Sequence, residues 1–261
     1  MNRLVILMYH ALYADEQELS DIPPSDRPYA VSVRDFDAHL DALAEDGLPI
    51  VDPRILATRE PAGPGVILTF DDGHESGYRL AFPRLAQRGH PAAFFVTTDF
   101  VDARPDFCRW AQLKEMADHR MLIGAHGRSH RFFDDLDENS AIGEFAESKA
   151  VIEEQLGREV VQMSFPGGRF TRKLVSIGMS SGYRCFHTSQ VGSERPRPFE
   201  AGAILPRIPV RRAMSAGSFR LLVNARRTAL MKLRAVAAAK SLARRIAGNR
   251  VYHEVYERLA N

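Results

Sequence analysis

The chain has 261 residues, of which 45% are hydrophobic and 26% are charged, an ordinary globular composition with enough apolar content for a substantial core. This composition excludes disordered and fibrous proteins. Two cysteines, Cys108 and Cys185, cannot build a disulfide framework or a Cys-x-x-Cys metal site, so we expect a reducing compartment. The apolar run near the N-terminus is short and lacks a cleavage site, and no stretch approaches the roughly 20 apolar residues of a membrane span. The sequence therefore predicts a cytoplasmic protein.

The net charge of +2 conceals an uneven distribution. Residues 201–250 hold twelve Arg and Lys and no Asp or Glu, which leaves 23 basic against 33 acidic residues elsewhere. We therefore expect two parts, a mildly acidic body over residues 1–215 and a basic extension over residues 216–261.

Short apolar runs rich in β-branched residues alternate with helical patterns along the first part. One helix begins at a capping box formed by Ser32 and Asp35, and another spans about Ser140 to Leu156 and ends at Gly157. Strands separated by helices pair in parallel, and the lack of a dinucleotide-binding glycine pattern favours a barrel-like α/β fold over a doubly wound sheet. The expected strands are Leu4–Met8, Gly65–Phe70, Ala92–Thr97, Met121–Ala125, Val160–Phe165 and Ile204–Val210.

Two adjacent carboxylates, Asp71 and Asp72, follow the predicted strand Gly65–Phe70 and precede Gly73. Residues at the carboxyl end of a barrel strand lie at the face where catalytic groups usually gather. Neighbouring side chains point in different directions, so one carboxylate can bind a metal while the other accepts a proton. The alternative interpretation is a strand-to-helix turn whose aspartates cap the next helix.

Two histidines, His126 and His130, directly follow the predicted strand Met121–Ala125. If the segment turns helically, both imidazoles can reach one ion, and one carboxylate would complete the three-ligand arrangement of hydrolytic zinc. Surface histidines at this spacing are also common, so the pair is weak evidence alone. Because both polar pairs follow predicted strands, we expect them at the same rim of the barrel.

The segment Pro166-Gly167-Gly168 also follows a predicted strand. Its glycines let the backbone approach a ligand closely and present an N–H near Gly167 to a developing oxyanion. By itself the segment is only a turn.

Several short motifs occur in a fixed order along the chain: Met8-Tyr9-His10, Phe36-x-x-x-Leu40, Thr69-Phe70-Asp71-Asp72-Gly73, Phe94-Phe95-Val96-Thr97-Thr98, Trp110-x-x-Leu113, His126-x-x-x-His130, Ser148-Lys149 and Phe165-Pro166-Gly167-Gly168. In this combination and order they resemble the polysaccharide deacetylase family, the NodB-homology domain, over roughly residues 4–210. The resemblance implies a distorted or incomplete (β/α) barrel, here followed by a C-terminal helical extension.

The resemblance also implies a divalent metal, usually Zn²⁺, with Asp72, His126 and His130 as its ligands and Asp71 as the catalytic base. A metal held in this way lowers the pKa of a bound water toward about 7, and the ionised Asp71 can accept the proton. The nucleophile so formed can attack an amide carbonyl.

The chain departs from the family pattern near the base. Gly127 stands where a small hydroxyl residue usually follows the first metal histidine, which removes one supporting hydrogen bond. Ser164 stands where the family usually has an arginine that orients the base. Either Arg169 or Arg207 is expected to take over that role.

The late Leu-x-His motif, which supplies the general acid in the family, is absent. Leu205-Pro206-Arg207 stands in its place, as in a divergent branch. His187 and His10 are the candidates for the general acid, and the sequence favours neither. Trp110 is expected either to form a wall of the sugar site or to pack in the core.

Residues from about Ser218 to Ala247 are expected to form one or two basic amphipathic helices with Arg220, Arg227, Arg234 and Arg245 on the polar side. Such an element can lie on an anionic membrane. It can equally pack on the barrel or in an oligomer interface, which its alanine-rich apolar positions favour. No base-reading motif accompanies the charge, which argues against a nucleic-acid partner.

The sequence thus predicts a cytoplasmic, metal-dependent hydrolase that removes an N-acetyl or N-formyl group from an amino sugar. The expected substrate is a glycan intermediate of surface-polysaccharide assembly, lipid-linked at the inner membrane face. Two alternatives stay open: a cyclic-amide or ureide hydrolase on the same scaffold, and a catalytically silent carbohydrate-binding module, which the absent late histidine would suit.

Overall fold

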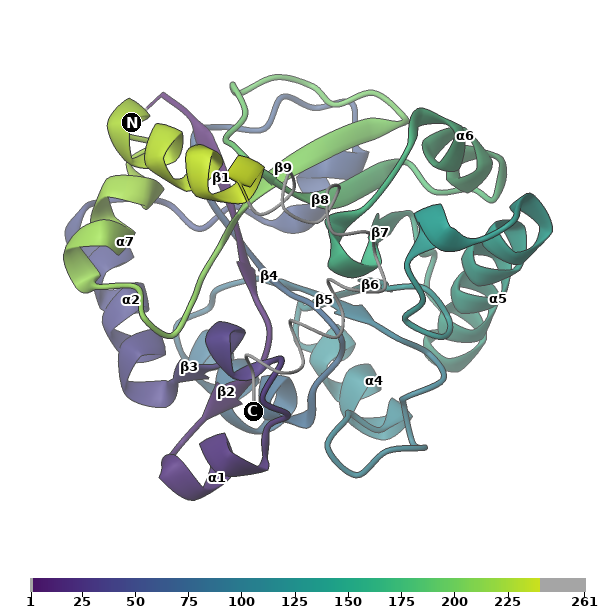
Figure 1. The fold of residues 1–261 in the computed structure, drawn as a ribbon, viewed down its shortest axis with the longest axis horizontal. Helices are drawn as coiled ribbons and strands as arrows, with labels where there is room; N and C mark the ends of the chain where they lie inside the picture. Colours follow the sequence, from purple (N-terminus) through teal and green to yellow (C-terminus); the bar gives the residue numbers. More distant parts are fainter. Residues whose placement is uncertain (1, 240–261) are drawn as a thin grey trace.

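The computed structural model describes residues 2–239. Within this range parallel strands close into a barrel in the order β1-β4-β5-β6-β7-β8-β9 (Figure 1). The expectation of a (β/α) barrel is confirmed. The barrel strands are β1 (Leu4–Tyr9), β4 (Gly65–Phe70), β5 (Ala93–Val96), β6 (Leu122–Ala125), β7 (Gln162–Ser164), β8 (Cys185–Val191) and β9 (Ala203–Pro209).

Helices surround the barrel on the outside, with α2 and α7 on one side and α5 and α6 on the other (Figure 1). A short parallel pair, β2 (Leu12–Tyr13) with β3 (Val31–Ser32), lies outside the barrel. The helices are α1 (Glu16–Asp21), α2 (Val33–Glu45), α3 (Phe82–Gln87), α4 (Trp110–Asp118), α5 (Glu138–Leu156), α6 (Arg172–Ser180) and α7 (Ala216–Val223), and a further helix spans residues 227–239.

The two helix boundaries that the sequence marks are confirmed. The Ser32 hydroxyl accepts a hydrogen bond from the Asp35 N–H at 3.0 Å and so caps α2. Helix α5 ends at Gly157, whose φ of 64° is the left-handed conformation that glycine adopts without a Cβ clash.

Alternation along the strands separates two apolar layers. In β1, Val5 and Leu7 pack in the large cluster that includes Phe36 of α2, whereas Leu4 and Ile6 belong to a second cluster. That second cluster includes Ile67, Cys185 and Leu205, which come from strands β4, β8 and β9. Successive residues of a strand point to opposite faces, one toward the inside of the barrel and one toward the surrounding helices. The same alternation decides on which side the polar residues that follow each strand lie.

Strand β8 is missing from the strands that the sequence predicts. Its segment contains His187, Thr188 and Ser189, whose polarity hides the strand. In the barrel, His187 and Thr188 are fully buried; His187 Nε2 lies 3.0 Å from Gln162 Oε1, and the Thr188 hydroxyl donates to the Leu205 carbonyl. Tertiary pairing with β7 and β9 therefore overrides the local pattern.

The basic extension begins with two helices that pack on the barrel. The Phe219 ring stacks on the buried His39 ring of α2 at 3.9 Å between centroids, and Leu230 is buried. Arg220 forms ion pairs with Glu45 and Asp46, and Arg234 Nε donates to the Val191 carbonyl at 2.8 Å.

These arginines keep contact with solvent, since Arg227 and Arg234 are exposed and the Arg220 side chain is 37% exposed in its ion pairs. The helix breaks at residues 224–226, where Ala225 has a φ of 51°, so one helical period does not continue across the break. Arg245 lies outside the described residues. The division into domains 1–215 and 216–261 stays a prediction, and no helix within residues 2–239 has the length and apolar content to cross a bilayer.

Candidate active site and metal centre

The carboxyl ends of the barrel strands bring the predicted site residues together. Asp71 and Asp72 follow β4, His126 follows β6, and Arg207 lies near the end of β9. Backbone hydrogen bonds continue the ladder into the site, because the Asp71 N–H donates to the Tyr9 carbonyl at 2.9 Å and the His126 N–H to the Val96 carbonyl at 2.8 Å. The convergence that the sequence predicts at one rim is therefore present.

Asp72, His126 and His130 face one another closely. The Nε2 atoms of His126 and His130 lie 3.1 and 3.2 Å from the same Asp72 oxygen, Oδ1. One ligand atom from each of the three residues lies within 4.8 Å of the other two. Burial opposes charge on Asp72, yet the two adjacent imidazoles hold the pKa of its carboxyl well below the usual range.

The chemistry of this donor set fits a cation. His126 Nδ1 lies 2.8 Å from the Ser164 carbonyl oxygen, which can only accept, so in a neutral ring Nδ1 carries the proton. The lone pair of Nε2 then faces the Asp72 carboxylate, which is also an acceptor. Two acceptor atoms that face each other repel, but both could coordinate a divalent ion placed between them. The Ser164 carbonyl would then fix the orientation of the His126 ring.

Asp71, the neighbour of Asp72 in the chain, pairs with Arg207. The Arg207 guanidinium donates to Asp71 Oδ1 at 2.7 Å and to Oδ2 at 2.6 Å, and both side chains are buried. The Ser164 hydroxyl donates to Asp71 Oδ2 at 3.0 Å. Burial opposes the charge of Asp71, but the guanidinium outweighs it and lowers the pKa of the carboxyl to about 2. Asp71 is therefore ionised throughout the neutral range.

Arg207, and not Arg169, is the arginine beside the base. The Arg169 guanidinium forms ion pairs with Asp134 at 2.7 Å and Asp135 at 2.6 Å. Arg207 also reaches the Ser164 hydroxyl at 2.8 Å, at the position where the family usually has its arginine. The guanidinium thus comes from β9 and meets a small side chain on β7.

The two candidate acids occupy different environments. His10 is half-buried, its ring centroid lies 5.0 Å from that of Tyr29, and its buried Nδ1 has no hydrogen-bond partner. Its charge is among the causes that lower the pKa of both Asp71 and Asp72. His187 is fully buried, with Nε2 3.0 Å from Gln162 Oε1, and burial holds the pKa of its imidazole well below the usual range.

The third motif forms a tight turn after β7. Gly167 and Gly168 have φ values of 63° and 67°, and the Gly168 N–H donates to the Phe165 carbonyl at 2.7 Å. A Cβ on Gly167 would lie 2.7 Å from the Phe132 ring, so only glycine fits there. Pro166 is buried at the start of this turn, whereas Trp110, the first residue of α4, is half-buried and packs against the main core.

One buried polar residue near the metal ligands was missed by the sequence reasoning. Glu144 of α5 accepts hydrogen bonds from the turn between the two histidines. The available signal is its position: it is flanked by Ala141, Phe145 and Ser148, which form the buried stripe of the helix. A carboxylate within such a stripe calls for donors from a neighbouring segment.

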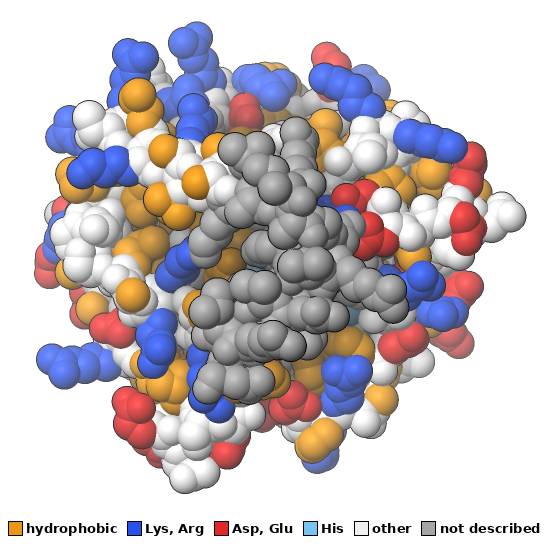
Figure 2. Space-filling view, viewed as in Figure 1, with side chains coloured by type: hydrophobic (Ala, Val, Ile, Leu, Met, Phe, Trp, Pro, Cys, Tyr) orange, Lys and Arg blue, Asp and Glu red, His pale blue; other side chains and the backbone are white. Residues whose placement is uncertain are grey.

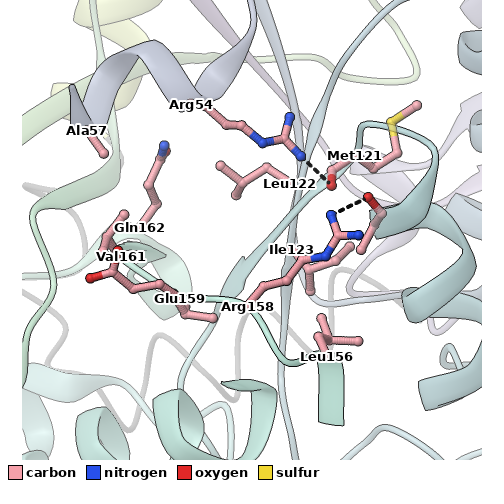
Figure 3. Close-up of a pocket in the computed structure, with 12 residues that line it drawn as sticks. Arg54, Ala57, Met121, Leu122, Ile123, Leu156, Arg158, Glu159, Val161 and Gln162 are labelled. Carbon is pink, nitrogen blue, oxygen red and sulfur yellow. Dashed lines mark hydrogen bonds between the residues drawn. The ribbon is translucent and has the colours of Figure 1, made fainter. Parts of the chain in front are cut away.

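A cavity of about 170 Å³ lies away from these ligands, beside the amino ends of β6 and β7 (Figure 3). Its floor is apolar, and Arg54 and Arg158 lie at its edge. Arg54 donates to the Met121 carbonyl at 3.0 Å and Arg158 to the Ala117 carbonyl at 2.7 Å. Both guanidinium groups are thus engaged in holding the end of α4 and the start of β6.

Comparison with known proteins agrees with this geometry. The family model for polysaccharide deacetylase matches residues 58–186, a range that includes Asp71, Asp72 and both metal-site histidines. The chain belongs to the polysaccharide deacetylase family. Over 223 residues, 83% of the chain, this deacetylase is 26% identical to YxkH of Bacillus subtilis strain 168, a protein named for the same family, and the match covers 75% of YxkH.

Solved structures with the same fold include a bacterial deacetylase. PplD of Streptococcus pyogenes, a deacetylase solved in complex with acetate, superposes with a TM-score of 0.72 at 24% identity, covering 85% of this chain and 98% of PplD. IcaB from Ammonifex degensii gives a TM-score of 0.70 at 26% identity, covering 86% of this chain and 97% of IcaB. The barrel of this deacetylase is therefore the barrel of its family.

Proposed function

We propose that this deacetylase is a metal-dependent hydrolase that removes an N-acyl group, acetyl or formyl, from an amino sugar. The observation that carries the proposal is the meeting of Asp72, His126 and His130 beside an ionised Asp71. PplD, which shares the fold, was solved in complex with acetate, and this supports acetyl as the acyl group that is removed. The family assignment supports a glycan as the substrate.

Asp72, His126 and His130 would hold the divalent ion, and two nitrogens with one carboxylate oxygen suit Zn²⁺. When bound, such an ion supplies Lewis-acid activation of the acyl carbonyl and of the attacking water. The protein's own contribution is orientation. The Ser164 carbonyl fixes the His126 ring, and the ladder from β4 fixes the backbone that carries Asp72.

Asp71 acts as the base that receives the proton of the attacking water. Arg207 and the Ser164 hydroxyl hold its carboxylate in one orientation. The same contacts lower its basicity, since its pKa lies at about 2. Asp71 is therefore a weak base, but it is held in one position and is ionised at neutral pH.

His10 is the general acid that protonates the departing amine. It is only half-buried and directly follows β1, which pairs with the strand that precedes both aspartates, so it can reach a bound substrate. His187 suits the role less well, because it is fully buried, bonded to Gln162 and kept neutral by burial. A neutral, enclosed imidazole has no proton to deliver to substrate at neutral pH.

The turn at Pro166 and Gly167 would line the oxyanion side of the acyl group. Its left-handed glycines allow a ligand to approach the backbone closely, and a backbone N–H there can stabilise developing negative charge. Trp110 would contribute to the sugar site only through the part of its ring that the core leaves exposed.

The cellular substrate is proposed to be a lipid-linked glycan intermediate of surface-polysaccharide assembly, met at the inner face of the cytoplasmic membrane. Exposed apolar side chains occur on α7 and on the helix at 227–239, namely Leu221, Met231 and Val236. Exposed Arg226, Arg227 and Lys232 lie among them. Figure 2 shows Lys and Arg side chains gathered around the helix at 227–239, at the upper left. Basic residues beside exposed apolar ones suit the surface of an anionic bilayer.

The membrane contact is tested by sedimentation with vesicles. The full chain should pellet with vesicles containing phosphatidylglycerol and stay in solution with vesicles of phosphatidylcholine alone. A Met231→Ser, Val236→Ser variant should lose the binding and keep its activity on water-soluble oligosaccharides. Equal binding by the variant would contradict the assignment of this surface.

The activity is tested by amine release from N-acetyl and N-formyl amino-sugar oligomers after the protein has been loaded with Zn²⁺. The proposal predicts amine release that requires both the metal and Asp71. If the protein hydrolyses cyclic amides but none of the N-acyl sugars, it is instead the cyclic-amide or ureide hydrolase. Sugar binding without any amine release would indicate a silent binding module.

A further inference from the structure

The turn between the two candidate metal histidines is held by one buried side chain from a neighbouring helix. Glu144 lies on α5 and is 6% exposed. Its Oε2 accepts hydrogen bonds from the backbone N–H groups of Arg128 at 2.6 Å and Ser129 at 3.0 Å, and its Oε1 accepts from the Ser129 hydroxyl. One carboxylate thus takes three donors from two consecutive residues of the turn.

No ion pair in the described part of the chain includes Glu144. The nearby Arg128 guanidinium pairs with Glu147 at 2.5 Å and with Asp99 at 3.5 Å instead. A buried carboxylate persists in a fold only when donors satisfy it, and here the turn supplies them. The contact therefore links α5 to the metal-site turn through hydrogen bonds.

The turn needs support, because its two ends adopt left-handed backbone conformations. Gly127 has a φ of 75° and His130 a φ of 64°, and the second value is disfavoured for a residue with a Cβ. A Cβ on Gly127 would lie 3.0 Å from Glu144 Oε2 and 3.0 Å from the Phe133 ring. The missing side chain at Gly127 thus makes room for the carboxylate.

We propose that Glu144 is a positioning residue that sets the metal affinity of this deacetylase by fixing the turn that carries His130. The inference rests on the proposed function in one respect, namely that Asp72, His126 and His130 bind a divalent ion. His126 is held independently by β6 and by the Ser164 carbonyl. The Gly127 and Arg128 carbonyls accept from the loop after β5, so loss of Glu144 frees mainly the second half of the turn, which carries His130. Side chains that orient metal ligands typically change metal affinity about 10–100-fold when they are removed.

The test measures Co²⁺ and Zn²⁺ affinity by titration, with the visible spectrum of bound Co²⁺ as a second readout. Glu144→Ala should weaken both affinities at least about 10-fold and change the Co²⁺ spectrum. Glu144→Gln should stay within about 3-fold of the unmodified protein, because the amide oxygen can accept from both backbone N–H groups and the NH₂ group can donate to the Ser129 hydroxyl. The control is Glu147→Ala on the same helix, which removes only the exposed pair with Arg128 and should leave affinity unchanged.

If Glu144→Ala fails to fold, Glu144→Asp takes its place, since it keeps the charge and withdraws the oxygens by one methylene. Unchanged affinity in the folded variant, or equal losses in Glu144→Ala and Glu147→Ala, would overturn the inference. Failure of the unmodified protein to bind either metal would instead overturn the proposed metal dependence, so the two failures are distinguishable.

Discussion

The two ends of the barrel use polar side chains in opposite ways. At the amino end, the guanidinium groups of Arg54 and Arg158 bind backbone carbonyls beside an apolar cavity. At the carboxyl end, the Nε2 atoms of His126 and His130 face the same oxygen of Asp72. A cavity edged by charge is therefore not enough to mark a site. The mark of a site is a set of acceptor atoms that face one another and that a bound cation would satisfy.

The largest effect should come from replacing the base at the carboxyl end. Asp71→Asn keeps the shape of the side chain but removes the proton acceptor, so kcat/KM should fall by about 10²–10⁴-fold. The buried Arg207 also loses its counter-charge, which should destabilise the fold by about 3–5 kcal/mol. Kinetics at saturating zinc and chemical denaturation measure the two effects. An activity within 3-fold of the unmodified protein would remove Asp71 from the mechanism.

A second comparison separates the two candidate acids. His10→Gln should lower kcat by about 10²-fold or more, because the departing amine loses its proton donor. His187→Gln should affect stability more than kcat, since His187 is enclosed and bonded to Gln162. Steady-state kinetics and thermal melts of both variants decide the assignment. The reverse pattern would make His187 the acid and His10 a structural residue.

The pair of Asp71 and Arg207 makes a prediction about pH. With the pKa of Asp71 at about 2, protonation of the base does not set the acid limb of kcat/KM in the unmodified protein. Arg207→Met removes the cation and leaves burial, which raises the pKa of Asp71, so the acid limb should move to higher pH. Arg169→Met is the control, because Arg169 pairs with Asp134 and Asp135, and it should leave the acid limb in place.

The same pair contributes to stability with a definite sign. The folded pKa of Asp71 lies below the unfolded value of about 3.9, so its contribution is fully present above that value and is lost as the pH falls through about 2. Acid unfolding of the Arg207→Met variant should therefore begin at a higher pH than that of the unmodified protein. Coincident acid transitions would contradict the low pKa.

The sequence predicted the centre of the site better than its surroundings. Asp71, Asp72, His126 and His130 follow apolar strands, and parallel strands bring such residues to one rim. The sequence offers Arg207 and Arg169 alike as the arginine beside the base and does not mark Glu144, because packing across the barrel sets their partners. The sequence misses strand β8 and the surface contacts of Arg220 and Arg234 for the same reason, because long-range contacts decide them.

The smallest effect should follow substitution at the amino end. Arg158→Gln removes hydrogen bonds to the Ala117 carbonyl and to the half-exposed Asp118, which should cost about 1 kcal/mol of stability. Because the guanidinium only holds secondary structure there, kcat/KM should change less than about 2-fold. A large loss of activity with unchanged stability would show that the amino end of the barrel also takes part in function, which would contradict the difference drawn between the two ends.

The central claim is that Asp72, His126 and His130 together bind one divalent cation. Elemental analysis of the protein after zinc loading and gel filtration tests it most directly, with Asp72→Ala and His130→Ala as variants and Asp26→Ala as a control from a neighbouring loop. We expect one zinc per chain in the unmodified protein and the control, and almost none in the two site variants. A full complement of zinc in Asp72→Ala would contradict it.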